Sequence, residues 1–205
     1  MKIAVVGGTG DFGLALATRL AEAGVDVVIG SRDAERAREK AAEAGAAGGA
    51  ANADAVQGVD IVVLAVKAEA ALPTAAELAD AIGETPVLSV ASELRFTKSG
   101  VHPTTDDRSI AERIQDLLRG PVSAGLHSLA AASLASGRAD GDALVCGDDA
   151  VAKALALELA SNVVVGRALD AGPLSSARAL EGMTAVIVNL NRRYKGHAGI
   201  RVVGL

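Results

Sequence analysis

A glycine-rich turn between an apolar strand pattern and a helical pattern constrains the fold of this chain more than any other feature. The turn reads Gly8-Thr9-Gly10-Asp11-Phe12-Gly13; it follows the β-branched run Ile3–Val6 and opens a helical pattern over Asp11–Ala23. In that context Gly8 permits a tight turn, Gly10 lets a pyrophosphate approach the backbone, and Gly13 lets the helix pack closely on the strand. The helix N-terminus adds free N–H groups and partial positive charge. The sequence therefore predicts a dinucleotide phosphate loop.

Short apolar runs alternate with helical patterns along the rest of the chain. Further strands are predicted at Val25–Ile29, Ile61–Val66, Pro86–Val90 and Val122–Leu126, with helices between most of them. Continuous apolar strands in this order are typical of a parallel sheet covered on both faces. We expect an α/β protein, a Rossmann doubly wound parallel sheet over residues 1–140. Residues 141–205 are expected to form a small α/β elaboration that borders the active site and ends in a long helix.

Other segments are less regular or belong to the elaboration. Gly45–Asp54 is rich in small residues and fits a short strand or a loop. Ala91–Asp107 shows no clear period and is expected to be an irregular ligand loop. Beyond it, strands are predicted at Ala143–Cys146 and Val163–Leu169, with a helix over Asp149–Ala160 between them. The last helix is expected from Ser175 to about Tyr194.

The end of the second strand indicates which dinucleotide binds. An NAD-binding protein usually has an acidic residue there for the ribose 2′-hydroxyl, whereas this chain reads Gly30-Ser31-Arg32. Asp33, one step on, is better used as a helix cap. Ser31 can donate a hydrogen bond to a 2′-phosphate, and Arg32 and Arg36 can bind it with charge. The alternative for the arginines is a solvated helix start, with Arg36 paired to Glu35 or Glu39. The residues favour NADP over NAD.

Composition excludes several classes of function. The net charge is −5 with both signs interspersed, so nucleic acid is not an expected partner. The single cysteine, Cys146, and the absence of a Cys/His cluster argue against a metal site. The run Ile61–Val66 is too short to span a bilayer, and the start lacks the features of a signal peptide. We expect a cytoplasmic protein with no membrane partner.

Five blocks of the sequence point to a known family, namely Gly7–Gly13, Val28–Arg32, Ala124–Ser128, Val145–Asp149 and Leu169–Arg178. Together they resemble the F420-dependent NADP oxidoreductases. The resemblance implies a compact α/β protein, often oligomeric through its C-terminal part, that moves a hydride between NADP(H) and the 5-deazaflavin coenzyme F420. The segments Val66–Glu69 and Ser89–Phe96 depart from the family pattern, and so does the C-terminus.

The resemblance also assigns candidate site residues. Thr9, Ser31, Arg32 and Arg36 match the family's NADP-binding positions, and the segment from His127 to Leu129 matches the place where nicotinamide and deazaflavin meet. The full expected cofactor-binding set is Gly8, Thr9, Gly10, Asp11, Phe12, Gly13, Ser31, Arg32, Arg36, Ala65, Val66, Lys67 and Leu129.

His127 and a few cations are the remaining candidates for site chemistry. His127 follows an apolar strand, at the sheet edge where ligands bind, and is either an orienting group near the nicotinamide or a packed structural histidine. Lys67 either contacts cofactor or substrate there or extends to water. Arg95, Lys98 and Arg108 could meet the anionic tail of a deazaflavin, which carries phosphate and glutamates, although loop cations are more often solvated.

Three functions fit these residues. Direct hydride transfer between NADP(H) and F420 needs two rings held in contact and little side-chain chemistry. A reductase of another small carbonyl or imine would need a proton donor, for which only His127 or a lysine is available. A non-catalytic NADP-binding redox sensor would bind without turnover. The apolar face of the last helix indicates a homodimer contact, or packing on the sheet.

Overall fold

A sheet of eight strands, in the order β10-β9-β8-β5-β4-β1-β2-β3, runs through the middle of the molecule. The computed structural model describes all residues from Met1 to Leu205. The strands are β1 (Lys2–Val6), β2 (Asp26–Ser31), β3 (Gly48–Ala51), β4 (Ile61–Leu64), β5 (Val87–Ser89), β8 (Val122–Gly125), β9 (Ala143–Gly147) and β10 (Ala168–Asp170). From β3 to β8 all neighbours pair in parallel, which confirms the predicted Rossmann core.

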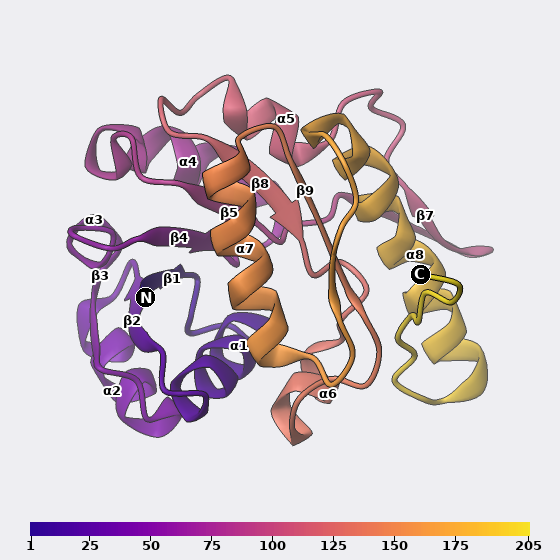
Figure 1. Cartoon of the computed structure of the whole chain (residues 1–205), viewed down its shortest axis with the longest axis horizontal. Coiled ribbons are helices and arrows are strands. Elements are labelled where there is room, and N and C mark those ends of the chain that lie inside the picture. The colour runs from indigo at the N-terminus through magenta and orange to yellow at the C-terminus, as the bar shows by residue number, and fades with distance from the viewer.

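Helices cover both faces of the sheet, as Figure 1 shows. In chain order they are α1 (Asp11–Glu22), α2 (Ala34–Ala44), α3 (Asn52–Ala55), α4 (Ala68–Ile82), α5 (Ile110–Gln115), α6 (Ala131–Ser136), α7 (Ala150–Val163), the 3-10 turn η1 (Leu174–Ser176) and α8 (Ala177–Tyr194). None of them is both long and apolar enough to cross a membrane.

The alternation of side chains along the strands separates two cores. On β1, Ile3 and Val5 pack with α1, α2 and α7, whereas Ala4 and Val6 pack with α4, α5 and the start of α8. This is the period of two that a strand imposes. Every residue from Ile3 to Val6 and from Ile61 to Leu64 is fully buried. Burial on both faces explains why these strands read as continuous apolar runs in the sequence.

The C-terminal elaboration reverses the direction of the sheet. β9 pairs antiparallel with β8, and β10 then pairs parallel with β9. The expected strand over Val163–Leu169 is wrong in its bounds, because α7 continues to Val163 and only Ala168–Asp170 pairs as a strand. Between them Gly166 packs against the backbone of Gly141, where an added Cβ would lie 2.3 Å from a carbonyl oxygen.

The segment expected as an irregular loop contains a hairpin. β6 (Leu94–Thr97) pairs antiparallel with β7 (Gly100–Pro103), outside the main sheet. The hairpin packs on α8, which stands at the side of the molecule opposite β2 and α2 (Figure 1). Gly45–Asp54 is also more ordered than a loop, since it holds β3 and the first residues of α3.

Candidate functional site

The glycines of the phosphate loop differ in what constrains them, and the left-handed backbone of the turn lies at Gly7, with a φ of +83°, and not at Gly8 as expected. An added Cβ at Gly13 would lie 2.4 Å from the carbonyl oxygen of Gly7, and one at Gly8 would lie 2.9 Å from Val5 O, so both positions exclude side chains by close packing. Gly10 differs, because its nearest neighbour would be 3.5 Å away and it is exposed. The protein itself therefore leaves space at Gly10, which fits the close approach of a bound group.

No side chain caps the N-terminus of α1. Gly10 is its N-cap residue, and the first helical residues, Asp11 and Phe12, follow directly. The free N–H groups of this first turn are therefore available to an anion, and the dipole of a twelve-residue helix favours negative charge there. Thr9 is half-buried and Asp11 exposed at the same turn. The loop thus fits the pyrophosphate of a dinucleotide.

The end of β2 presents cations and no free carboxylate. Asp33 accepts hydrogen bonds from the backbone N–H groups of Glu35 and Arg36, at 3.0 and 3.1 Å, so its predicted role as helix cap is confirmed. Ser31 is buried, and its Oγ accepts a hydrogen bond from Asp33 N. Arg32 and Arg36 are both exposed, and neither forms an ion pair. The alternative pairing of Arg36 with Glu35 or Glu39 is not found.

A mostly apolar pocket opens where β1, β4, β5 and β8 end. Its volume is about 220 Å³. Six of the expected site residues line it, namely Phe12, Ala65, Val66, Lys67, His127 and Leu129; the other lining residues are Ala68, Val90, Ala91, Ser92, Leu94, Leu126 and Thr184. Ligands of open α/β sheets bind at this edge. An apolar slot beside a phosphate loop suits a planar ring system.

A second hollow is larger but is lined by few of the expected site residues. It has a volume of about 620 Å³ and lies between α1 and α6, with Leu14, Thr18 and Ala132 among its lining residues. Only Asp11 of the expected site residues touches it. The smaller pocket is the better candidate site, because it gathers residues from five separate stretches of the chain, among them that of His127.

Strained backbone places His127 at the pocket. The preceding residue, Leu126, has a φ of +65°, a left-handed conformation that a branched side chain rarely adopts. Leu126 is nevertheless buried, and its carbonyl accepts a hydrogen bond from Leu129 N at 3.0 Å. This turn ends β8 abruptly and presents His127 and Leu129 to the pocket. Strain of this kind persists where the surrounding structure imposes it, often at functional sites.

His127 is buried and neutral. Its Nε2 lies 3.3 Å from the carbonyl oxygen of Ala91, which can only accept, so Nε2 carries the proton. Burial lowers the pKa of His127 to about 4, against the smaller opposing effect of the Ala91 hydrogen bond. Its Nδ1 is then an acceptor, and it is buried without a partner. Nδ1 of His127 therefore lacks a hydrogen-bond donor within the protein, and an N–H group of a bound ligand would supply one.

Hydroxyl groups tie His127 to two other walls of the pocket. Thr184 Oγ1, on α8, donates to the main-chain carbonyl of His127 at 2.9 Å. Ser92 Oγ lies 2.8 Å from Thr184 Oγ1. Because the only proton of Thr184 is already used, Ser92 must be the donor in that pair. A chain of two hydrogen bonds therefore runs across the pocket, from the Ser92 hydroxyl to the Thr184 hydroxyl and from there to the His127 carbonyl.

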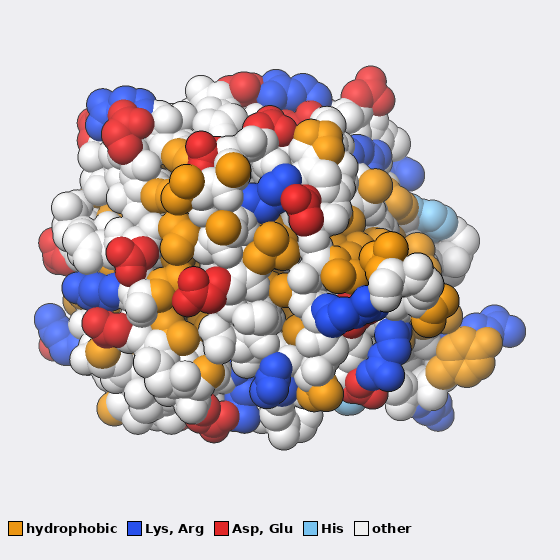
Figure 2. Space-filling model, in the orientation of Figure 1, with side chains coloured by type: hydrophobic (Ala, Val, Ile, Leu, Met, Phe, Trp, Pro, Cys, Tyr) orange, Lys and Arg blue, Asp and Glu red, His pale blue; other side chains and the backbone are white.

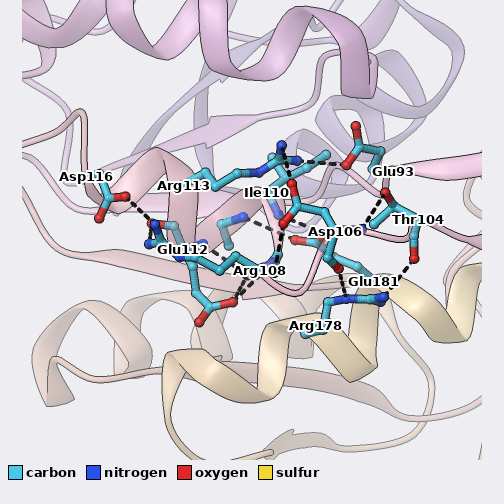
Figure 3. Close-up of polar contacts among 12 residues, drawn as sticks. Glu93, Thr104, Asp106, Arg108, Ile110, Glu112, Arg113, Asp116, Arg178 and Glu181 are labelled. Atoms are coloured by element: carbon cyan, nitrogen blue, oxygen red, sulfur yellow. Dashed lines mark hydrogen bonds and ion pairs between the residues drawn. The ribbon is translucent and has the colours of Figure 1, made fainter.

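Ionic contacts fix the segment between the hairpin and α5, as Figure 3 shows. Arg113 binds Glu93 at 2.8 Å and Asp106 at 3.2 Å, and Arg178 donates to the carbonyls of Thr104 and Asp106. Arg108, a candidate contact for the anionic tail of a deazaflavin, instead pairs with Asp116 at 2.6 Å. These contacts hold Glu93, and with it the Ser92–Leu94 wall, in place.

Glu181 is the buried carboxylate of this region. It lies on α8 and accepts hydrogen bonds from the backbone N–H groups of Ile110 and Ala111, at 3.0 and 3.1 Å, at the start of α5. Burial raises its pKa to about 7, more than those hydrogen bonds and the nearby Arg113 and Arg178 lower it. It joins α8 to α5 behind the pocket.

The remaining expected residues take less central places. Lys67 is exposed at the pocket rim and forms no ion pair. Sequence reasoning gave Thr184 no site role, and it identified Val90, Ser92 and Leu94 only as part of the segment Ser89–Phe96, where the second substrate is expected to bind. Ser92 and Leu94 follow the end of β5, and that position at the carboxyl edge was the signal that could have identified them.

The fold and the glycine loop are those of the dinucleotide-binding Rossmann class. Comparison with known proteins narrows this class. Residues 2–93 match the model of the family described as NADP oxidoreductase coenzyme F420-dependent. The F420-dependent NADP reductases of Methanothermobacter thermautotrophicus and Methanocaldococcus jannaschii are 38% and 35% identical over the whole chain, covering 96% and 99% of those proteins. The chain belongs to the F420-dependent NADP reductase family.

Solved structures agree with this membership. A crystal structure from Arthrobacter sp. FB24, assigned as an F420-dependent NADP reductase, superposes with a TM-score of 0.84 at 27% identity and covers 100% of this chain and 99% of that one. A pyrroline-5-carboxylate reductase from Coxiella burnetii gives 0.67 at 18% identity over 95% of this chain and 66% of that one. The second likeness shows a shared fold alone.

Proposed function

We propose that this protein is an oxidoreductase that transfers a hydride between NADP(H) and coenzyme F420. The observation that carries the proposal is the pocket: six expected site residues converge on one apolar slot beside the phosphate loop. The full-length similarity to named F420-dependent NADP reductases supports the same reaction.

The residues fit NADP(H) in particular. The open space at Gly10 and the uncapped start of α1 suit the pyrophosphate. Arg32 and Arg36 have no carboxylate partner, so their charges remain available to a 2′-phosphate, beside the Ser31 hydroxyl. The two bound rings supply the redox chemistry themselves, one giving and one receiving the hydride.

The protein's part is to orient the rings and exclude water. Val66, Leu126 and Leu129 give the slot apolar walls, and Phe12 closes its phosphate-loop side. The Ser92–Thr184–His127 chain fixes the polar wall, and Nδ1 of His127 can accept a hydrogen bond from a ring N–H or carboxamide. Holding donor and acceptor in contact is the main requirement of such a transfer.

The carbonyl or imine reductase is a weaker candidate, because it needs a proton donor. With its pKa lowered to about 4, His127 is neutral at physiological pH, and its one proton is already donated to Ala91 O. Direct ring-to-ring transfer needs no such donor. A redox sensor would share the binding site but show no turnover.

One assay separates the candidates. The purified protein is mixed with NADPH and oxidised F420, and the loss of deazaflavin absorbance is followed. We expect turnover with no inflexion from His127 between about pH 5 and pH 8, since that residue stays neutral there. Tight NADPH binding without absorbance loss would refute the proposal and favour the sensor. Turnover of a small imine or carbonyl in place of F420 would favour the other reductase.

The organisation of the molecule completes the proposal. Residues 1–140 form the dinucleotide-binding domain, and residues 141–205 border the active site. Val186 and Leu190 on α8 are exposed, at 56% and 39%, and support a homodimer contact on that helix. Gel filtration with light scattering would test the dimer. We place the enzyme in the cytoplasm, where NADPH is available.

A further inference from the structure

Five cations at one end of the molecule have no ionic partner. They are Arg95 and Lys98 on the β6–β7 hairpin and Arg192, Arg193 and Lys195 at the end of α8, and we call them the distal patch. All five are exposed, and none belongs to an ion pair. No acidic residue occurs in the hairpin or after Glu181 in the chain, although the net charge of the protein is −5. The hairpin and the end of α8 therefore carry no carboxylate of their own.

The hairpin and the helix hold the distal patch together. Asn189 Oδ1 accepts from Val101 N at 2.9 Å, and its Nδ2 donates to Val101 O at 2.7 Å, so α8 is bonded to β7. Arg192 and Arg193 lie three and four residues further on, on the same helical face. The guanidinium of Arg192 lies 5.5 Å from the centre of the Phe96 ring. Figure 2 shows Lys and Arg side chains gathered around the side of the molecule where α8 ends.

The distal patch continues the pocket outward. Leu94 and Thr184 both line the pocket, and their elements run from there toward the patch. Leu94 and Phe96 share a face of β6 and are about 7 Å apart along the strand. Thr184 and Arg192 are eight residues apart on α8, about 12 Å. An anion on a short chain attached to a ring in the pocket would therefore reach these cations.

Two groups of unpaired cations therefore flank the pocket. Arg32 and Arg36 lie beyond the phosphate loop, and the distal patch lies beyond the hairpin and α8. The helix dipole favours Arg192 and Arg193 in the last turn of α8, but it gives no reason for Arg95 and Lys98 on a separate hairpin. Phe96, 66% exposed beneath Arg192, adds a flat apolar surface to the same place.

We propose that the distal patch binds the anionic chain of the deazaflavin substrate, through its phosphate and carboxylate groups. The proposal rests on the proposed function, because it assumes that the deazaflavin ring occupies the pocket. The cations then act on the affinity for this substrate and leave the hydride transfer itself to the pocket. Such exposed contacts weaken as salt screens them.

The test compares two deazaflavins that share the ring and the ribityl chain. One is F420 with its phosphate and glutamates, and the other ends at the ribityl hydroxyl. The variant is the triple substitution Lys98→Gln, Arg192→Gln and Arg193→Gln in the full chain. Arg119→Gln, which removes an exposed cation that pairs with Glu84 and does not line the pocket, is the control for the general effect of losing surface charge. The KM and kcat with NADPH are measured, and direct binding is followed by deazaflavin fluorescence.

We expect the triple variant to raise the KM for F420 about 10-fold, with kcat and the KM for the tail-free deazaflavin unchanged. Added salt should raise the KM for F420 in the wild type and much less in the variant. An equal change for both deazaflavins, or none for F420, would overturn the inference while the proposed function stands. Absence of turnover in the wild type with tail-dependent binding would instead overturn the proposed function and support the patch. Equal affinity for F420 and the tail-free deazaflavin would contradict the role of the distal patch, whether or not the protein shows turnover.

Discussion

Thr184 Oγ1 on α8 donates a 2.9 Å hydrogen bond to the main-chain carbonyl of His127, at the end of β8. The contact joins the last helix of the elaboration to the residue expected beside the nicotinamide. The same hydroxyl accepts from Ser92, so a single side chain aligns two walls of the pocket. One wall of the pocket is thus held in place by a residue of the C-terminal helix.

Replacing Thr184 by Val tests this dependence. The substitution keeps the shape and removes both hydrogen bonds, so we expect kcat to fall about 10-fold through loss of alignment. Thr184→Ser keeps the hydroxyl and should stay within about 2-fold of the wild type. Steady-state kinetics with NADPH and F420 give the comparison, and thermal unfolding shows that both variants are folded. Equal losses for Val and Ser would argue against the hydroxyl.

Arg32→Ala should change the preference for NADPH over NADH. Loss of a charge-assisted contact to the 2′-phosphate costs about 1.5–3 kcal/mol, so we expect the KM for NADPH to rise roughly 10- to 100-fold. The KM for NADH should hardly change. Arg38→Ala removes an exposed cation of α2 that forms no ion pair, six residues beyond Arg32, and serves as the control. An equal rise in the KM for NADPH and for NADH in Arg32→Ala would show that Arg32 does not bind the 2′-phosphate.

Gly10→Ala and Gly13→Ala should fail in different ways. At Gly13 the added Cβ would lie 2.4 Å from Gly7 O, so we expect a loss of stability of about 1–3 kcal/mol in urea unfolding. At Gly10 the protein leaves 3.5 Å, so the fold should hold while NADPH affinity falls. Gly48→Ala, with nothing within 4 Å, is the control for both. A Gly10→Ala protein that binds NADPH normally would contradict the role assigned to that loop.

Glu181 should make stability depend on pH. Its pKa rises from 4.5 to about 7 on folding, so the folded state binds the extra proton in that window. The free energy of unfolding should therefore fall as pH rises from about 4.5 to about 7, by on the order of 3 kcal/mol, and then level off. Urea midpoints across this range test it, with Glu181→Gln expected to lose the slope and the exposed Glu158→Gln to keep it. A slope that survives in Glu181→Gln would assign it to another group.

The parts of the site that depend on local sequence were predictable. The glycines of the phosphate loop pack against residues that are close in the chain, so their spacing alone indicates the turn. Ser31 and Arg32 come at the end of a strand that is itself visible in the sequence. Ser92 and Thr184 touch across 92 residues, and no local pattern encodes such a contact. The hairpin also escaped prediction, because β6 is only four residues long and largely exposed, so its short alternation of Leu94 and Phe96 with polar residues is a weak signal. The reversal at β9 was equally hidden, since a buried run has the same composition in either direction.

The reversed strands β9 and β10 determine where α8 begins. Running antiparallel to β8, they end at the edge of the sheet away from the pocket, where Asp148 Oδ1 accepts from Leu174 N at 2.9 Å. α8 then crosses back, and its residue 184 arrives about 10 Å further along at the pocket edge. The pocket wall that faces the second substrate therefore depends on where α8 begins, whereas the phosphate loop, built from β1 and α1, does not.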